Sequence, residues 1–270
     1  MIASHELSVE RRWCEVTKVV RETELVPTDE HSPTLAGEVF GRLRADIISS
    51  RLPPGVKLRL EDLRRTYGVG FSPLREALSR LAENRLVVSI GQRGFRVPEV
   101  SVEEFMDIAM VRKEVEGYAL RLAIRKGDEL WEARLAAASE RFASLQRSGK
   151  TMAEDVWENR HRDFHVALVA ACQSPWLLHL HGLLTDQFDR YRRLSANSRL
   201  PNAPRWLSHK EIMQTALARN ADKAVKLLED HVSEAARLIA AGLLASSDRQ
   251  DAPVRVRKRK IARAQRRSAV

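Results

Sequence analysis

The fold of the first third of the chain is decided by the stretch Gly68-Val-Gly-Phe-Ser-Pro-Leu-Arg-Glu-Ala-Leu78. We interpret Ser72 as the N-cap of a helix and Pro73 as its first residue, where a missing N–H is harmless. From this start, apolar residues recur at i, i+3, i+4 and i+7 on the side that faces inward: Leu74, Ala77, Leu78 and Leu81. The opposite side carries small or donor-bearing groups: Ser72, Arg75 and Ser79.

A shorter helix is expected just before this one. The segment from Glu61 to Tyr67 ends at Gly68, a residue type that readily takes the left-handed conformation of a helix C-cap. Helix, tight turn and helix form the helix-turn-helix pattern, in which the N-terminal end of the second helix reads the major groove of DNA. We therefore expect Ser72, Arg75 and Ser79 to face DNA.

Two short β-prone runs follow the second helix. Residues 86–90 and 94–97 flank Gly91-Gln-Arg-Gly94, and this pattern predicts a hairpin with a tight glycine turn. Arg93 lies at the tip of the hairpin and Arg96 just after it, so both are candidates for contact with DNA. The pattern is typical of a winged helix-turn-helix with a basic wing.

A further helix is predicted upstream. Ser32-Pro33 caps it, and it extends to about Ser50 with four apolar residues facing inward: Leu35, Val39, Leu43 and Ile47. Pro53-Pro-Gly55 then forces a turn. Three helices and a wing thus occupy residues 32–99.

Three segments of this domain resemble the GntR family of bacterial transcription regulators. They are the stretch from Gly68 to Leu78, the upstream Leu52-Pro-Pro-Gly55, and the wing Gly91-Gln-Arg-Gly-Phe95. The resemblance implies that Arg75 is a DNA-contacting arginine of the recognition helix. Phe71 stands where a family member more often has Arg.

The net charge of +10 is unevenly distributed. Residues 33–99 carry 12 Lys or Arg against 7 Asp or Glu, and residues 251–270 carry 8 against 1, whereas residues 100–250 carry 22 against 21. Basic segments bind phosphate without reading sequence, so we expect the disordered tail, residues 247–270, to add non-specific affinity for DNA. The alternative is that this tail is only a solvated end.

The rest of the composition indicates where the protein works. The two cysteines, Cys14 and Cys172, are too few for a disulfide framework and fit a reducing compartment. No apolar run reaches the ~18 residues of a membrane span, and the polar start of the chain does not resemble a signal peptide. We expect a flexible leader over residues 1–31 and a cytoplasmic, nucleoid-associated protein with no membrane partner.

Ser101-Val-Glu-Glu104 is a capping box, and it marks the start of a second domain, residues 100–246. From there the sequence predicts helices only, at about 102–126, 128–147, 152–172, 175–197, 204–219 and 221–245. Helices joined by such short loops predict an all-α antiparallel bundle. The protein as a whole is therefore expected to be mostly α, and the nearly neutral bundle suits effector binding and dimerisation.

Four histidines fall on the inward faces of three of these helices: His161, His165, His209 and His231. Because His161 and His165 are four residues apart, their imidazoles lie on neighbouring turns and both reach one ion. Cys172 is seven residues beyond His165, about 10 Å along the helix axis, which is too far for a ligand. The alternative is that these histidines are ordinary core residues.

The same domain resembles the all-helical FCD effector domain of the FadR branch of the GntR family. The similar segments span about residues 101–245: His161-Arg-Asp-Phe-His-Val-Ala-Leu168, His209-Lys-Glu-Ile212 and Glu229-Asp-His231, with Cys172-Gln-Ser-Pro-Trp-Leu-Leu178 and Arg190-Tyr-Arg192 similar to the CsiR-like group. FCD domains commonly bind a divalent metal ion through one Asp and three His. The resemblance implies that His165, His209 and His231 are ligands. His161 stands in the Asp position, where we expect a weaker fourth ligand; the alternative is that it only hydrogen-bonds.

That departure changes the charge of the predicted site. Three neutral His and one Asp leave about +1 around a divalent ion, whereas four neutral His leave about +2. The site should therefore favour an anion, which a small carboxylate effector would supply. A zinc-like ion tolerates four nitrogen ligands, and nickel also suits imidazole.

Arg112 projects from the first helix of the domain on its inward face, and Glu116 follows one turn later. A buried arginine must be paired, and an internal ion pair with Glu116 satisfies this requirement. The alternative, which the family resemblance favours, is that Arg112 binds the carboxylate of an effector in bidentate fashion. His181 lies on an inward face nearby and is a further candidate for the same pocket.

These features favour a metabolite-responsive DNA-binding regulator, a homodimeric repressor released by a small carboxylate bound next to a divalent metal. Its operator would be palindromic double-stranded DNA, because one recognition helix covers only a half-site. Two other classes stay open: a metal-dependent enzyme and a non-specific nucleic-acid binder. An enzyme needs a general base, and the inward faces that bear the histidines show no spare carboxylate at ligand spacing.

Overall fold

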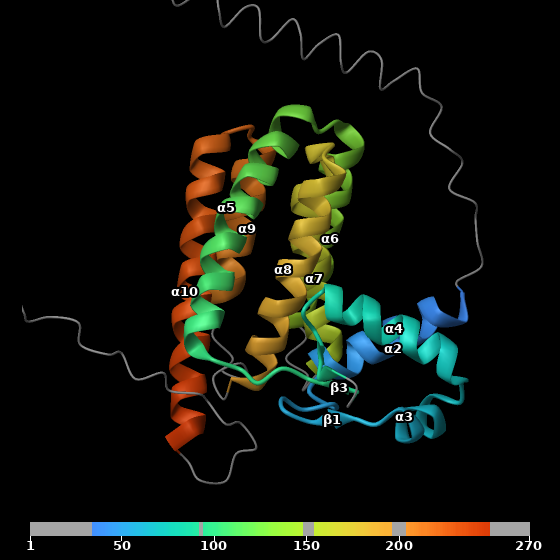
Figure 1. Ribbon diagram of the computed structural model, residues 1–270. Helices are drawn as coiled ribbons and strands as arrows, with labels where there is room; N and C mark the ends of the chain where they lie inside the picture. The colour runs from blue at the N-terminus through green and yellow to red at the C-terminus, as the bar shows by residue number, and fades with distance from the viewer. Residues whose placement is uncertain (1–33, 92–93, 148–153, 196–203, 249–270) are drawn as a thin grey trace, which may run out of the picture.

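The computed structural model describes residues 34–91, 94–147, 154–195 and 204–248. Within these ranges the chain forms two units, a winged helix and a bundle of long helices that stands beside it (Figure 1). The predicted leader, Cys14, Arg93 and the predicted tail beyond Asp248 lie outside the described residues.

Three helices build the core of the first unit: α2 (Leu35–Ile48), α3 (Leu60–Tyr67) and α4 (Phe71–Glu83). The inward stripe predicted for the second helix of the motif is confirmed, because all four of its apolar residues are fully buried. They pack against Val39, Leu43 and Ile47 of α2, as predicted. Gly68 ends α3 in the left-handed conformation, with φ of 69°, so the tight turn of the motif is also confirmed.

Two helix starts differ from the prediction. The N-cap of α2 is Thr34 rather than Ser32-Pro33, because its hydroxyl accepts a hydrogen bond from the backbone N–H of Gly37. One consequence is that Leu35 opens the helix on its outer side and is 52% exposed instead of inward.

α4 begins two residues earlier than the sequence predicted, at Phe71 instead of Pro73. Its N-cap is the extended Gly70, so the helix already includes Phe71, and Ser72 and Pro73 belong to its first turn. Because Ser72 is inside the helix, its hydroxyl makes no capping bond and is left exposed.

The wing is a sheet of three short antiparallel strands in the order β1-β3-β2. The predicted hairpin is confirmed as β2 (Val88–Ser89) and β3 (Phe95–Arg96), with Val88 opposite Arg96. The sequence did not predict β1 (Lys57–Leu58), which pairs with the other edge of β3. A strand of two residues carries no alternation that a pattern can reveal. The turn at Gly55, with φ of 78°, brings β1 back to the sheet.

The second unit contains the six predicted helices: α5 (Val102–Lys126), α6 (Glu129–Arg147), α7 (Glu154–Val169), α8 (Pro175–Leu194), α9 (Pro204–Leu217) and α10 (Ala221–Asp248). A short 3-10 turn, η2 (Ala170–Cys172), ends α7. The hydroxyl of Ser101 caps α5 by accepting from the N–H of Glu104 at 3.0 Å. No helix among the described residues is long and apolar enough to cross a membrane.

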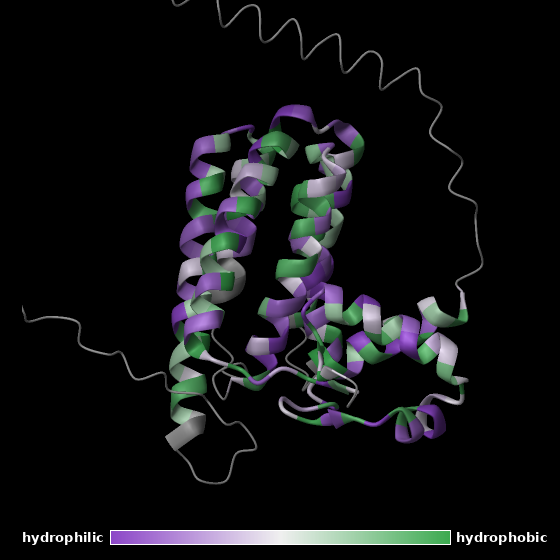
Figure 2. Cartoon of the chain, in the orientation of Figure 1, coloured by the Kyte–Doolittle hydropathy of each residue, from purple (hydrophilic) through white to green (hydrophobic). Residues whose placement is uncertain are grey.

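α5 is the central helix of the bundle, since it packs against α10, α8 and α7. Its buried side holds Phe105, whose ring stacks on Tyr191 of α8 at 5.0 Å between centroids. Tyr191 in turn donates a hydrogen bond to Glu104 at 2.7 Å. Hydrophobic and polar residues both occur along α5, α8 and α10, the helices that Figure 2 shows in front. This packing fixes the first turns of α5, which follow directly from the wing.

The two units meet where α2, the end of α4 and the linker between the wing and α5 lie against α8 (Figure 1). Arg44 of α2 forms an ion pair with Asp186 of α8, and Gln187 donates to the carbonyl of Asn84 at 2.9 Å. Arg190 of α8 is buried, and it donates to the carbonyl of Pro98 in the linker. The helical period could not reveal this partner, because it comes from the other unit.

Candidate functional site

The exposed side of α4 carries the residues predicted to face DNA. Ser72, Arg75 and Ser79 are all exposed, and Arg75 forms no hydrogen bond or ion pair with another described residue. Arg96 is exposed on the wing. A cation lies close to Phe71, the position where family members more often have Arg. The guanidinium of Arg64 is 5.4 Å from the Phe71 ring centroid.

The four predicted histidines converge at the centre of the second unit. α7 supplies His161 and His165, α9 supplies His209, and α10 supplies His231. One ring nitrogen from each lies within 4.8 Å of those of the other three. Three of the residues are buried and His231 is half-buried. The spacing argument from the sequence therefore identified a real cluster.

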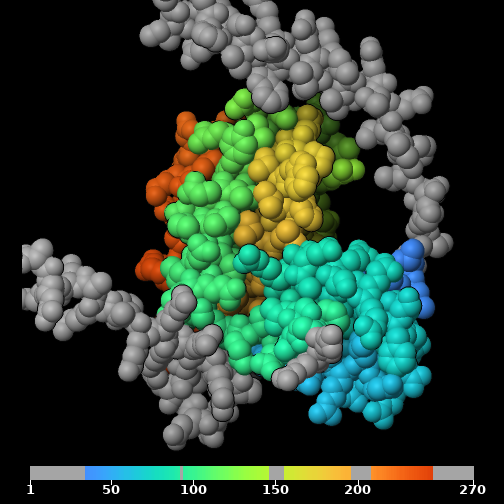
Figure 3. All heavy atoms as spheres, viewed as in Figure 1, coloured from blue at the N-terminus to red at the C-terminus, as the bar shows by residue number. Residues whose placement is uncertain are grey.

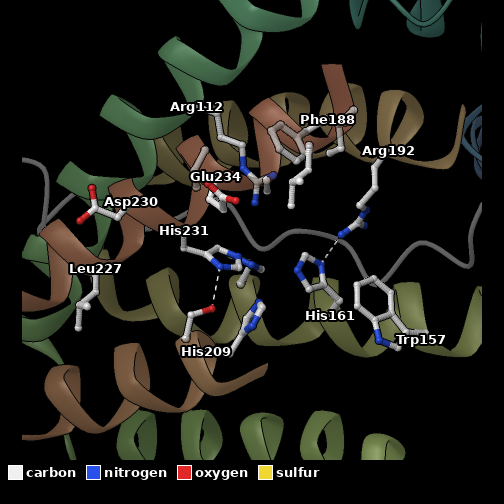
Figure 4. Close-up of a pocket in the computed structure, with 16 residues that line it drawn as sticks. Arg112, Trp157, His161, Phe188, Arg192, His209, Leu227, Asp230, His231 and Glu234 are labelled. Carbon is white, nitrogen blue, oxygen red and sulfur yellow. Dashed lines mark hydrogen bonds between the residues drawn. The ribbon is translucent and has the colours of Figure 1, made fainter. Parts of the chain in front are cut away.

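A cavity of about 390 Å³ opens beside the imidazoles (Figure 4). α5, α7, α8, α9 and α10 all contribute to its wall, which is apolar for the most part. The charged side chains in the wall include Arg112 and Arg192, and both guanidinium groups point toward the histidines in Figure 4. A cavity of this size, apolar and lined by a few convergent polar groups, suits a small molecule.

Glu116 lies behind His165, and the sequence did not predict this contact. Its carboxylate is fully buried, accepts from Nδ1 of His165 at 2.6 Å and pairs with Nε of Arg112 at 2.9 Å. Burial alone would raise the pKa of Glu116, but the charge of Arg112 and the hydrogen bond from His165 hold that pKa well below its ordinary value. The group is therefore an ionised acceptor, which fixes the His165 proton on Nδ1.

The Nε2 atom of His165 consequently carries no proton and has a free lone pair. It is buried and has no hydrogen-bond partner among the described residues. Burial lowers the pKa of His165, so the ring stays neutral. A metal-binding histidine commonly donates its other N–H to a carboxylate, which orients the ring and raises its basicity. The residues of this site thus fit a divalent metal ion.

Of the two roles that the sequence left open for Arg112, the internal ion pair is observed. Its Nε forms the internal ion pair with Glu116, while its two terminal nitrogens hydrogen-bond to no other described residue. The guanidinium lies over the ring of Phe188, 4.4 Å from the centroid, at the wall of the cavity. His181 is not among the residues that line this cavity; its Nε2 lies 3.5 Å from Glu116.

Arg192 contacts His161 on the opposite side of the cluster. Its NH1 atom lies 2.7 Å from Nδ1 of His161, and its NH2 atom pairs with Glu158 and with Asp189. Burial lowers the pKa of His161 well below its ordinary value, and the charge of Arg192 adds to this effect. His161 is therefore a neutral imidazole. No pattern along the sequence revealed this contact, because Arg192 belongs to α8 and His161 to α7.

A continuous series of ion pairs connects this site with the DNA-binding unit. Asp189 binds Arg192 at 2.7 Å and also pairs with Arg162 of α7. Arg162 reaches Asp186 at 2.6 Å, and Asp186 pairs with Arg44 of α2. Burial alone would raise the pKa of Asp189, but the neighbouring guanidinium groups lower it. We call this series, from Arg192 to Arg44, the interdomain ion-pair row.

Known proteins share both units of the chain. Residues 35–97 match the model of bacterial regulatory proteins of the gntR family, and residues 107–234 match the FCD domain. The uncharacterised HTH-type transcriptional regulator BphR of Paraburkholderia xenovorans is 38% identical over 76% of this chain and 85% of its own length. The HTH-type transcriptional repressor GlaR of Escherichia coli is 36% identical over 70% of this chain and 89% of its own.

The fold is also found in a solved structure. E. coli McbR/YncC superposes with a TM-score of 0.68 over 77% of this chain and 98% of that one, at 20% identity. The fold and these relatives define a DNA-binding transcriptional regulator in which a winged helix is joined to a helical effector domain. The chain belongs to the GntR family and carries an FCD domain. Since its relatives are regulators, the enzyme alternative is set aside.

Proposed function

We propose that this regulator is a repressor whose release from DNA is controlled by a small carboxylate bound next to a divalent metal ion. The observation that carries the proposal is the cavity in which four imidazoles meet the unbonded end of Arg112. That the relative GlaR is a repressor supports the direction of the response.

The metal would be held by His165, His209 and His231. His165 would bind through its bare Nε2. His231 would bind through Nε2 while its Nδ1–H donates to the hydroxyl of Ser208 at 3.0 Å. Zinc suits such a nitrogen set, and nickel also binds imidazole well. When bound, the ion would supply a positive charge and an open position for an oxygen ligand.

The charge of the surroundings favours an anionic effector. Glu116 and Arg112 are both buried and form one ion pair. The cavity wall also holds Asp230 and Glu234, which pair with Lys226 and Arg237. These pairs leave the charge of a divalent ion uncompensated. A carboxylate would neutralise it in part, and the two terminal nitrogens of Arg112 have the geometry to bind such a group in bidentate fashion. The cavity of about 390 Å³ limits the effector to a small molecule.

Two connections would carry the response to the DNA-binding unit. α5 leads from the wing directly to Arg112, and the interdomain ion-pair row leads from Arg192 to α2. An effector that binds more tightly to the DNA-free arrangement of the units shifts the protein toward it and lowers operator affinity.

We further propose that two copies pair through α5 and α8 to bind a palindromic operator. Both helices expose large apolar side chains, including Met110, Tyr118, Trp176 and Leu180, which are between 40% and 76% exposed. α5 and α8 lie next to each other on the surface in Figure 3. An apolar face of this kind on a soluble unit is typical of a contact with a partner, and a two-fold pair presents two recognition helices to one site.

The proposal is tested by measuring metal content and operator affinity on the same sample. His165→Ala should abolish stoichiometric metal and the response of operator binding to small mono- and dicarboxylates. Asp163→Ala is the matched control, because Asp163 is exposed on α7, the helix of His165, and lies outside the cavity. Excess competitor DNA separates operator binding from non-specific attraction. If His165→Ala keeps one metal ion per chain, the proposed site is wrong.

A further inference from the structure

His161 and His165 face the same cavity, but His161 presents a hydrogen-bond donor to it and His165 an acceptor. Arginine has only donors, so Arg192 must donate to Nδ1 of His161, and that nitrogen must be an acceptor without a proton. A neutral imidazole holds a single proton, which in His161 is then on Nε2. In His165 the partner is the Glu116 carboxylate, so the proton lies on Nδ1 and Nε2 is bare.

The two rings are close enough to act on the same bound group. Their centroids lie 4.7 Å apart, on successive turns of α7. The ring nitrogen of His161 that does not face Arg192 points toward the other imidazoles (Figure 4). His165 therefore offers a lone pair to the cavity, whereas His161 offers an N–H.

The surroundings of Arg192 hold this arrangement in place. Its guanidinium is buried and is bound on its far side by Glu158 and Asp189, so it has no room to turn away from His161. For His161 to bind a metal through Nε2, its proton would have to move to Nδ1, where it would face an N–H of the guanidinium. Metal-binding histidines place their second N–H against an acceptor, and here a donor occupies that position.

We propose that His161 is a hydrogen-bond donor to the effector and not a metal ligand, so that its Nε2–H binds an oxygen of a metal-bound oxyanion. This inference rests on the proposed function, which it makes more specific. Three histidines would hold the ion, and the effector oxygens would meet an N–H from His161 on one side and Arg112 on the other. The residue that replaces the family's aspartate would then select for an anion.

The first test uses the unaltered sequence, loaded with Zn2+ and labelled with 15N-histidine. Long-range 1H–15N correlation spectra distinguish ring nitrogens that are protonated, bare or metal-bound. We expect His161, assigned by its disappearance in His161→Gln, to show a protonated Nε2 and a bare Nδ1. A metal-bound Nε2 in His161 would overturn the inference.

The second test uses Co2+ as the metal and acetate as the carboxylate, followed by the visible absorption of the ion. His161→Ala should keep stoichiometric Co2+, while its dissociation constant for acetate rises by about ten- to a hundredfold, as expected for the loss of a hydrogen bond to a charged group. His161→Asp should also keep Co2+ and bind acetate less tightly, because the N–H is lost and a negative charge is added. Unchanged acetate affinity in His161→Ala would overturn the inference.

The metal site and the donor role of His161 are tested by different outcomes. Loss of Co2+ from His161→Ala, as from His165→Ala, would overturn the donor role and leave the proposed metal site standing. If the unaltered protein binds no stoichiometric Co2+, the proposed function fails and the donor role fails with it.

Discussion

Replacing Glu116 by Gln is a sharp test of how the site is built. The carboxylate accepts from His165 through one oxygen and from Arg112 through the other. An amide has one oxygen and one NH2 group, so either orientation sets a donor against one of these two partners. If the NH2 group faces His165, the ring must accept at Nδ1, and its lone pair at Nε2 is lost.

The expected loss of unfolding free energy in Glu116→Gln follows from the burial of the ion pair. Glu116 and Arg112 are 0% and 2% exposed, and removing one partner of a buried ion pair costs about 3–5 kcal/mol of unfolding free energy. For a unit of this size that corresponds to a fall in Tm of about 6–20 °C. Loss of the hydrogen bond that orients His165 should weaken metal affinity by about 10- to 100-fold.

The loss of stability in Glu116→Gln should depend on pH in a defined direction. Because the folded-state pKa of Glu116 lies well below its ordinary value, the ion pair contributes fully above the unfolded-state pKa of about 4.3. That contribution disappears as the pH falls through the folded-state pKa. The stability difference between the two proteins should therefore be constant from about pH 8 to pH 5 and shrink in stronger acid.

The assays are thermal unfolding across pH and metal affinity by competition with a chelator. Glu211→Gln is the matched control, since Glu211 is exposed on α9 outside the cavity and the proposed pairing face, and should change neither quantity. A Glu116→Gln variant that melts within about 2 °C of the parent and binds metal equally well would refute this account of the site.

Four other outcomes are expected. Arg75→Ala should weaken operator binding by about 1–3 kcal/mol in fluorescence anisotropy, and unchanged affinity would remove Arg75 from the reading surface. Deleting residues 255–267 should flatten the plot of log affinity against log salt, whereas an unchanged slope would make the tail a passive end. Arg44→Ala should weaken the effect of bound carboxylate on operator binding, so that operator affinities with and without carboxylate become more similar. An unchanged effect would show that the interdomain ion-pair row does not carry the response. Met110→Glu should shift the protein toward monomer in light scattering, since it puts a charge into the proposed pairing face.

The helices and the inward direction of the four histidines could be predicted, because each depends on spacing within one helix. The period of 3.6 residues places His161 and His165 inward whatever lies opposite them. Their hydrogen-bond partners could not be predicted, because Glu116 and Arg192 reach them from α5 and α8. The same limit explains Arg190, whose partner is a carbonyl of the linker.

The short elements were missed for a different reason. β1 has only two residues, so its position depends on the edge offered by β3 and not on any pattern of its own. The start of α4 depends on the extended backbone of Gly70, a choice that competes closely with a cap at Ser72. Local signals of nearly equal strength leave such boundaries to the tertiary context.

The interdomain ion-pair row also limits how freely such regulators exchange parts. Asp186 is buried and divides its carboxylate between Arg162 of its own unit and Arg44 of the DNA-binding unit. A chimera that joins this FCD domain to a foreign winged helix would leave that carboxylate short of one guanidinium, unless the graft carries a basic residue at position 44. Compatibility of grafted halves in this protein therefore includes a charge requirement at position 44 of α2.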